Sequence, residues 1–141
     1  MMQFEYFLKT KEVKRCSPDL ELAKSLIKDM KERIEKSLLL DSKIFAKFIF
    51  ENIYDGLRDF CDALLALSGF KSYSHQASIS FLSKEGFDMT LIEEFDQYRY
   101  KRNGSKYYGQ IITSVDSEEI KKFYTRIKSR IDTIINKNKL K

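Results

Sequence analysis

Apolar side chains recur every three or four residues along almost the whole chain, and this spacing limits the fold more than any other feature of the sequence. It is the spacing of one face of an α-helix, whereas a half-buried strand would alternate apolar and polar residues. Only 1 Pro and 5 Gly occur among the 141 residues, so the chain has few of the turn residues that an all-β protein needs. The sequence therefore predicts an all-α fold.

Five main helices follow from this spacing and from residues that favour helix ends. Ser17, which precedes Pro18, is typical of a helix start. Asp41 and Asp88 are suitable N-terminal caps, and Gly69 is typical of a helix end. The predicted helices cover residues 17–39, 42–68, 73–84, 89–102 and a last stretch that begins at Ser114 or Asp116.

The remaining segments complete a single-domain organisation over residues 1–141, without repeats or linkers. Residues 1–16 form an N-terminal arm or short helix, in which residues 1–9 have helical character and residues 11–16 form an extended link. A turn is expected at Phe70 and Lys71, Gly86 closes the third helix, Gly104 and Gly109 bracket a loop, and residues 136–141 form a basic tail.

Short connections between helices predict an up-and-down bundle in which neighbours are antiparallel. The helix over residues 42–68 has an unusually wide apolar sector, so it is either central or shared with a partner subunit. We therefore expect a homodimer.

Charge is distributed unevenly along the chain. Lys and Arg number 26 and Asp and Glu number 21, which gives a net charge of +5. Residues 121–141 hold eight basic residues and only one acid, Asp132, so this segment carries +7 and the first 120 residues carry −2. The overall basicity is thus a property of the C-terminal segment and does not by itself indicate a nucleic-acid-binding protein.

Several classes of protein are disfavoured by what the sequence lacks. No apolar run approaches the length of a membrane span, and no signal peptide is recognisable, so a cytoplasmic protein without membrane association is expected. Cys16 and Cys61 form no CxxC pair and suggest neither a disulfide framework nor a zinc site. Nucleotide-binding glycine-rich loops and common hydrolase motifs are absent, so we expect no cofactor and no metal.

The strongest local signal is a basic and aromatic stretch at the end of the fourth predicted helix. Four cations lie within eight residues without an acid, interleaved with four tyrosines: Arg99, Lys101, Arg102, Lys106, Tyr98, Tyr100, Tyr107 and Tyr108. Cations mixed with flat aromatic rings suit a phosphate backbone and stacked bases. The alternative is that the tyrosines pack inward and the cations form a solvated face.

His75 is the only histidine, so a Ser/His or Cys/His catalytic pair would have to include it. It lies at the predicted first turn of a helix, where the positive end of the helix dipole favours the neutral ring. A capping or packing role is favoured over a catalytic one.

The segment from Arg99 to Gly109 resembles the motif region of the HEPN superfamily (higher eukaryotes and prokaryotes nucleotide-binding domains). Active members carry an Arg, commonly followed by a polar residue such as Asn, and then a His after a short interval. Two further stretches are similar to archaeal HEPN-like proteins: residues 54–77, from Tyr54-Asp55-Gly56-Leu57-Arg58 to His75-Gln76-Ala77, and residues 13–26, with Val13-Lys14, Pro18-Asp19 and Ala23-Lys24-Ser25-Leu26.

For active members the resemblance implies metal-independent RNA cleavage, in which Arg and His from two subunits meet at a dimer interface. Arg102 and Asn103 match the start of the motif, but Tyr107 stands where the His would be. Because the pKa of tyrosine is about 10, its side chain is a poor general base at neutral pH. The resemblance also implies that a minimal nucleotidyltransferase partner forms a toxin–antitoxin pair with such a domain.

We therefore expect a catalytically degenerate HEPN-like module that binds RNA, a nucleotide or a partner protein. The predicted ligand-binding residues are Arg99, Arg102, Asn103, Lys106, Tyr107 and Tyr108. One alternative is a metal-independent endoribonuclease, in which Arg102, Asn103 and Tyr107 would be the catalytic residues. The other is a structural bundle.

In the structural alternative, the two arginines of the basic stretch serve only to pair with acids of their own helix. The pairs would join Arg99 and Arg102 to Glu93, Glu94 or Asp96.

Overall fold

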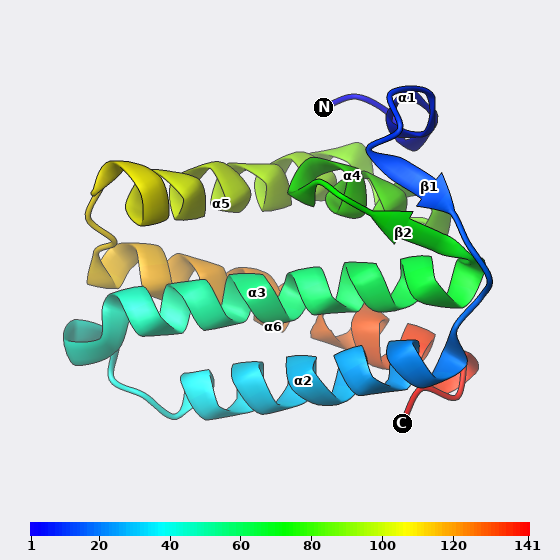
Figure 1. Ribbon diagram of the computed structural model, residues 1–141. Helices are drawn as coiled ribbons and strands as arrows, with labels where there is room; N and C mark the ends of the chain where they lie inside the picture. The colour runs from blue at the N-terminus through cyan, green and yellow to red at the C-terminus, as the bar shows by residue number, and fades with distance from the viewer.

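The computed structural model describes residues 1–141 as six α-helices, one 3-10 helix and one pair of short strands (Figure 1). In chain order the elements are α1 (Phe4–Lys9), β1 (Val13–Arg15), α2 (Leu20–Leu38), α3 (Ser42–Ser68), β2 (Phe70–Ser72), α4 (His75–Ser80), the 3-10 helix η1 (Phe81–Glu85), α5 (Met89–Tyr108) and α6 (Ser114–Lys137). This confirms the predicted all-α class. Every helix is too short or too polar to cross a membrane.

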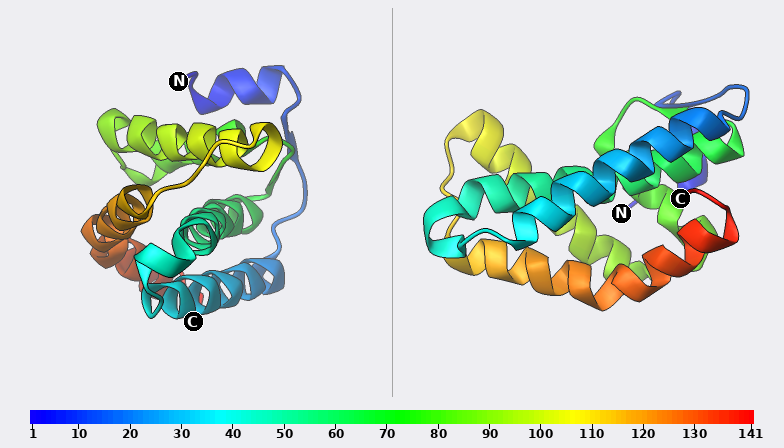
Figure 2. Two further views of the ribbon diagram at one scale, coloured as in Figure 1. Left: turned by 90° about the vertical axis from the view of Figure 1, so that its left-hand side faces the viewer. Right: turned by 90° about the horizontal axis from the view of Figure 1, so that it is seen from below.

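Four long helices form the bundle, and α3 lies at its centre (Figures 1 and 2). Helices α2 and α3 form one antiparallel hairpin and α5 and α6 form a second, as predicted for chain neighbours. Helices α3 and α6, which pack against each other, run in the same direction. The short elements α1, β1, β2 and α4 gather at one end of the bundle.

The wide apolar sector of α3 is explained by its central position. Its side chains pack against α2, α6, α4, α5 and β2, and Ile49, Phe50 and Ile53 are fully buried. The width of this sector is therefore no argument for a partner subunit, because the chain itself covers most of it. Only the first turns of α3 leave large apolar side chains exposed, at Ile44, Phe45 and Phe48.

Local capping rules predicted most helix ends correctly. The Asp41 carboxylate accepts a hydrogen bond from the Lys43 amide at 2.8 Å, and Gly69 ends α3 with a φ of 82°. Asp88 caps α5, and Gly86 follows η1 in the left-handed conformation. These positions have the side chains and the conformational freedom that helix ends require.

The predicted start of α2 at Ser17 is wrong. Asp19 is the cap, and its side chain accepts a hydrogen bond from the Leu22 amide. The residues before α2 are hydrogen-bonded to the end of α3: the Cys16 amide donates to the Gly69 carbonyl, and the Asp19 amide donates to the Ala66 carbonyl. This long-range backbone pairing outweighs the local preference of Ser17 and Pro18.

The expected turn at Phe70 and Lys71 is a strand. Strand β2 pairs antiparallel with β1, with Lys14 facing Lys71. The extended link predicted for residues 11–16 is thus confirmed around β1, and the helix expected over residues 1–9 is confirmed as α1. Three-residue strands have too little alternation to be recognised in the sequence.

The helix expected over residues 73–84 is divided into two elements. Ser74 caps α4 by accepting a hydrogen bond from the Ala77 amide, and the chain tightens into η1 from Phe81. The last helix begins at Ser114, with Thr113 as its cap and Asp116 completing a reciprocal capping box. The tail beyond α6 folds back, so Leu140 is buried.

The loop predicted between Gly104 and Gly109 does not exist, because α5 continues through Gly104 to Tyr108. The absence of a side chain at Gly104 instead makes room for Gln110: a Cβ there would lie 2.1 Å from Gln110 Oε1. Only Gly109, with a φ of 69°, ends the helix.

Candidate functional site

The predicted ligand-binding residues lie on the last turns of α5 and divide between two of its faces. A hollow of about 410 Å³ opens beside these turns, and we call it the α5 hollow. Its lining residues are Arg99, Tyr100, Asn103, Gly104, Tyr107, Tyr108 and Gln110. Four of the six predicted residues therefore share one surface, since Arg99, Asn103 and Tyr107 follow at intervals of four along a continuous helix. Their position on one surface does not require a turn at Gly104.

Arg102 and Lys106 do not line the α5 hollow. Arg102 is only 7% exposed, and its Nη2 donates to Asp55 Oδ1 on α3 at 3.2 Å. Its guanidinium also lies 5.7 Å from the centre of the Tyr54 ring. Lys106 Nζ lies 5.7 Å from the centre of the Tyr107 ring. Within one chain, Arg102 therefore faces the bundle interior, away from Tyr107.

The ion pairs that the structural alternative predicts are present for one arginine and absent for the other. Arg99 Nε donates to Asp96 Oδ1 at 2.6 Å, as that interpretation expected. Arg102 pairs with Asp55 from another helix and with none of the three acids considered on α5. The ion pair of Arg99 leaves 18% of its side chain exposed at the edge of the α5 hollow.

A second group of polar side chains lies between α3, α4 and α5, and we call it the arginine–histidine cluster: Tyr54, Arg58, His75, Arg99 and Arg102. The His75 ring stacks on Tyr54, with the ring centres 6.0 Å apart. His75 Nδ1 lies 3.0 Å from the Tyr54 hydroxyl, and Arg58 Nη1 contacts Nε2. An arginine can only donate, so Nε2 accepts and Nδ1 carries the ring proton that is donated to Tyr54.

Burial and neighbouring cations keep His75 neutral. Burial lowers its pKa most, and Arg58, Arg102 and Arg99 lower it further, to about 4. This agrees with the prediction of a neutral packing histidine. Because Nε2 is occupied by Arg58, His75 offers no free base in this arrangement.

Carboxylates on α3 line the other side of these cations. Asp62 accepts a hydrogen bond from the Ser78 hydroxyl at 2.7 Å, and Arg58 Nε lies 3.6 Å from its other oxygen. Burial raises the pKa of Asp62, and it raises the pKa of Asp59 to about 7 in spite of Arg33, whose Nε lies 3.3 Å from Asp59. The carboxylates are therefore weaker counter-charges than their number suggests.

The sequence contained a signal for this cluster that the motif search missed. Four charged residues occur at helical intervals in the otherwise largely apolar part of α3 over residues 53–67, namely Asp55, Arg58, Asp59 and Asp62. Charges in one stripe of a buried helix need partners, which predicts a polar contact with another helix. Their partners on α4 and α5 are distant in sequence and are identified only by the structure.

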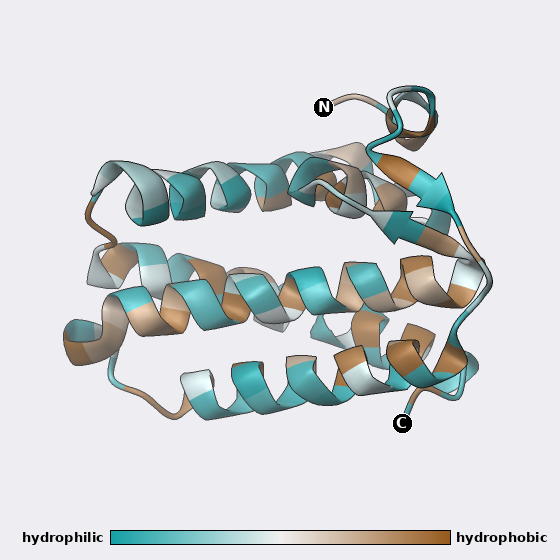
Figure 3. Cartoon of the chain, viewed as in Figure 1, coloured by the Kyte–Doolittle hydropathy of each residue, from teal (hydrophilic) through white to brown (hydrophobic).

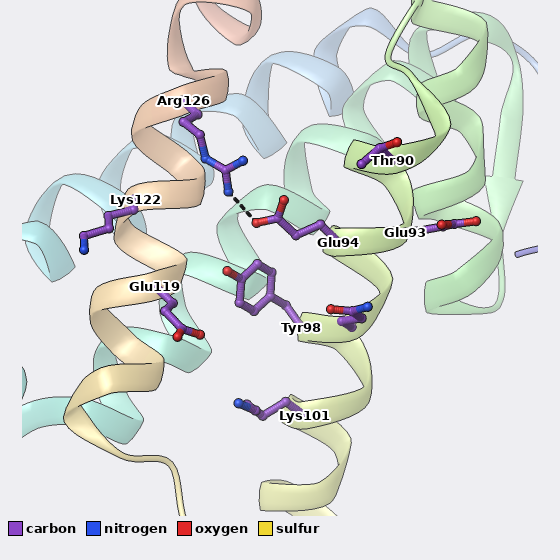
Figure 4. Close-up of a pocket in the computed structure, with 9 residues that line it drawn as sticks. Thr90, Glu93, Glu94, Tyr98, Lys101, Glu119, Lys122 and Arg126 are labelled. Carbon is purple, nitrogen blue, oxygen red and sulfur yellow. Dashed lines mark hydrogen bonds and ion pairs between the residues drawn. The ribbon is translucent and has the colours of Figure 1, made fainter.

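Another hollow, of about 630 Å³, lies between α5 and α6, and its lining is balanced in charge (Figure 4). Arg126 and Glu94 form an ion pair across it, and burial raises the pKa of Tyr98 to about 12. Its charged lining residues are three acids and three bases: Glu93, Glu94, Glu119, Lys101, Lys122 and Arg126. This balance favours neither an anion nor a cation, so we assign it no ligand.

The α5 hollow is lined by no histidine and no carboxylate, the side chains that most often act as general acid or base. Tyr107 is 64% exposed. No three His, Cys, Asp or Glu side chains are grouped as metal ligands, and Cys61 is buried while Cys16 is exposed. The α5 hollow thus offers guanidinium, amide and phenol groups.

Comparison with protein-family models, curated proteins and solved structures gives no match. The resemblance to the HEPN superfamily therefore stays a hypothesis, and the assignment of function depends on the geometry of the site.

Proposed function

We propose that this protein is a HEPN-like module that binds single-stranded RNA or a nucleotide at the α5 hollow without cleaving it efficiently. The observation that carries the proposal is the combination of a partly exposed arginine with three exposed phenol rings on one surface. Tyr100, Tyr107 and Tyr108 are 72%, 64% and 80% exposed, although large aromatic side chains are usually buried.

Each group has a definite part in such recognition. Arg99 provides a planar fork that can hold a phosphate, because only one of its nitrogens donates to Asp96. The Asn103 amide can read a base edge, and the tyrosine rings offer faces on which bases stack. Lys106, beside Tyr107, adds positive charge at the rim.

The absence of a base at the α5 hollow supports binding rather than catalysis. A ribonuclease of this kind must remove the proton of the ribose 2′-hydroxyl, and a phenol is protonated at neutral pH. His75 is the one imidazole of the chain, and both of its ring nitrogens are engaged in the arginine–histidine cluster.

Pairing with a second copy of the chain is part of the proposal. Exposed apolar side chains gather at the end of the bundle where α2 joins α3 and α5 joins α6, as the brown patches of Figure 3 indicate. They are Leu39, Ile44, Phe45, Phe48, Ile111 and Val115. A hydrogen bond from Ser42 to Glu118 holds the two junctions together. An exposed apolar surface of this kind favours association.

RNA binding is tested by fluorescence anisotropy with a labelled oligoribonucleotide. Tyr107→Ala and Tyr108→Ala should each weaken binding by about 1 kcal/mol or more through lost stacking. Arg99→Lys should weaken it less, since charge remains but the fork is lost. Lys128→Ala is the control, because Lys128 lies on α6 and pairs only with Asp132. An equal effect of the control would show that the charge of α6 binds RNA and would contradict the proposal.

Cleavage is tested on the same RNA in the presence of a chelator. The parent should not cleave it, and Tyr107→His should gain activity if a second copy supplies the arginine. Cleavage by the parent that Tyr107→Phe abolishes would establish the endoribonuclease instead. Sedimentation should give about twice 16.7 kDa for the parent and a monomer for Phe48→Glu. A monomeric parent would remove the dimer from the proposal.

A further inference from the structure

Helix α2 and the tail beyond α6 border a hollow of about 420 Å³ that carries an excess of positive charge, and we call it the lysine hollow. Its charged lining residues are four lysines and one acid: Lys24, Lys28, Lys31, Lys141 and Glu21. Only Lys24 forms an ion pair, and it lies 4.0 Å from Glu21. The hollow of Figure 4, by contrast, holds three acids and three bases. The lysine hollow therefore has both the space and the unbalanced charge that an anion requires.

Three of these lysines form a row on one face of α2. Lys24, Lys28 and Lys31 follow one another at intervals of four and three residues. At a rise of about 1.5 Å per residue, they cover about 10 Å of the helix axis. The acids of this part of α2, Asp29 and Glu32, line a different hollow toward α3. The row is thus a face of positive charge that is longer than a single phosphate.

The tail is held beside this row by a specific turn. After α6, the Lys139 amide donates to the Asn136 carbonyl. The Leu140 amide donates to the Ile135 carbonyl. This is the pattern of a Schellman motif, whose left-handed position is usually a glycine. Lys139 occupies that position with a φ of 56°, and the buried side chain of Leu140 anchors the turn, so that Lys141 lies at the lysine hollow.

We propose that the lysine hollow is a second binding site, which takes a chain of at least three phosphates such as inorganic polyphosphate or the triphosphate of a nucleotide. Lysine binds phosphate as a point charge, whereas arginine forks suit carboxylates, and no arginine lines the hollow. A row of lysines over about 10 Å can contact several phosphates in succession. No aromatic or amide side chain lines the hollow, so nothing there recognises a base. The site is independent of the α5 hollow, which lies at the opposite end of the bundle (Figure 1).

The test is a titration of inorganic tripolyphosphate into the full chain without divalent cations, followed by amide NMR spectra at constant ionic strength. We expect saturable shifts confined to residues 20–31 and 136–141. Affinity should fall as the salt concentration is raised, because the contacts are exposed. A parallel titration with ATP distinguishes the two sources. Saturation at the same amides by ATP shows that the triphosphate of a nucleotide is accepted, and saturation by tripolyphosphate alone assigns free polyphosphate.

Variants separate a built site from a general effect of charge. Lys28→Gln and Lys31→Gln should each weaken tripolyphosphate binding by about two- to fivefold, the range for one exposed ion pair. Lys43→Gln is the matched control, because Lys43 is an exposed lysine in the first turn of α3, at the other end of the bundle. Leu140→Ser keeps all four lysines but releases the tail, so it should also weaken binding. The two α2 variants change surface residues and keep the test valid if Leu140→Ser fails to fold.

Three results would overturn the inference. Shifts that do not saturate, or an equal loss in Lys28→Gln and Lys43→Gln, would show a general effect of charge. Equal affinity for a hexaglutamate peptide would assign the hollow to an acidic protein partner. Loss of RNA binding in Lys28→Gln would assign it to a nucleic-acid backbone. Tyr107→Ala should weaken RNA binding and leave tripolyphosphate binding intact, so failure at this site and failure at the α5 hollow are distinguished.

Discussion

Helices α2 and α3 pack closely at Gly56, and this contact makes a sharp prediction. A Cβ on Gly56 would lie 2.6 Å from Cγ1 of Ile34 and 2.9 Å from its Cδ1. A normal carbon contact is about 3.5 Å, so Ile34 would have to move by about 0.9 Å. Ile34 is fully buried, so its displacement would disturb the packing of the core.

Two opposing effects set the magnitude for Gly56→Ala. Alanine is favoured over glycine inside a helix by about 1 kcal/mol. Overpacking of a tight core costs about 1 to 3 kcal/mol, and a displacement of this size in a buried side chain belongs at the upper end. We therefore expect a net loss of about 1 to 2 kcal/mol in the free energy of unfolding, measured by urea denaturation with circular dichroism.

Two further variants test the reasoning. In an Ile34→Ala background, Gly56→Ala should become stabilising by up to about 1 kcal/mol, because the opposing side chain is gone. Gly104→Ala should also stabilise the parent, since its nearest obstacle is the end of the exposed and flexible Gln110 side chain. If Gly56→Ala is as stable as the parent, close packing of α2 on α3 is not what requires glycine there.

Three other predictions concern stability. The raised pKa of Asp59, about 7 in the folded chain against 3.8 normally, means that the folded state holds this proton more tightly; stability should therefore fall as pH rises from about 4 to 7, by up to about 1.4 kcal/mol per pH unit. Asp59→Asn should remove that part of the slope in denaturation curves recorded at pH 4.5, 6 and 7.5, and an unchanged slope would refute the assignment. Leu57→Ala should cost about 2 to 5 kcal/mol in urea denaturation because Leu57 is 1% exposed, and a loss below about 1 kcal/mol would contradict its place in the core. Thr113→Ala should cost about 1 kcal/mol through loss of the capping box with Asp116, detected as a lower thermal midpoint, whereas Thr113→Ser should restore it.

The parts of the fold that the sequence predicted are those that depend on neighbours in the chain. Asp41 and Gly69 mark the ends of α3 because a carboxylate and a left-handed glycine act within one helical turn. The errors have the opposite origin. The start of α2 is set by hydrogen bonds from residues 16–19 to α3. Helix α5 continues through Gly104, which has no positive φ, and the side chain of Gln110 from beyond the helix end lies against it.

The candidate site shows the same division. The spacing of Arg99, Asn103 and Tyr107 places them on one helix face, and the α5 hollow contains all three. The position of Arg102 was not predictable from its own helix, because its partner Asp55 belongs to α3. The charged stripe on α3 indicates that Asp55 needs a partner, but a single sequence does not identify which cation of another helix it is.

The pairing of β1 with β2 also affects the order in which the molecule assembles. Lys14 and Lys71 are paired although the whole of α2 and α3 lies between them in the sequence. The pairing therefore closes a long loop, and the entropic cost of closing it is recovered only after the hairpin of α2 and α3 has formed. Helix α1 attaches beyond β1, where Phe4 packs edge-on against Phe70 and Phe81. The N-terminal segment should therefore dock last during folding and open first under native conditions, exchanging its amide hydrogens before those of α3.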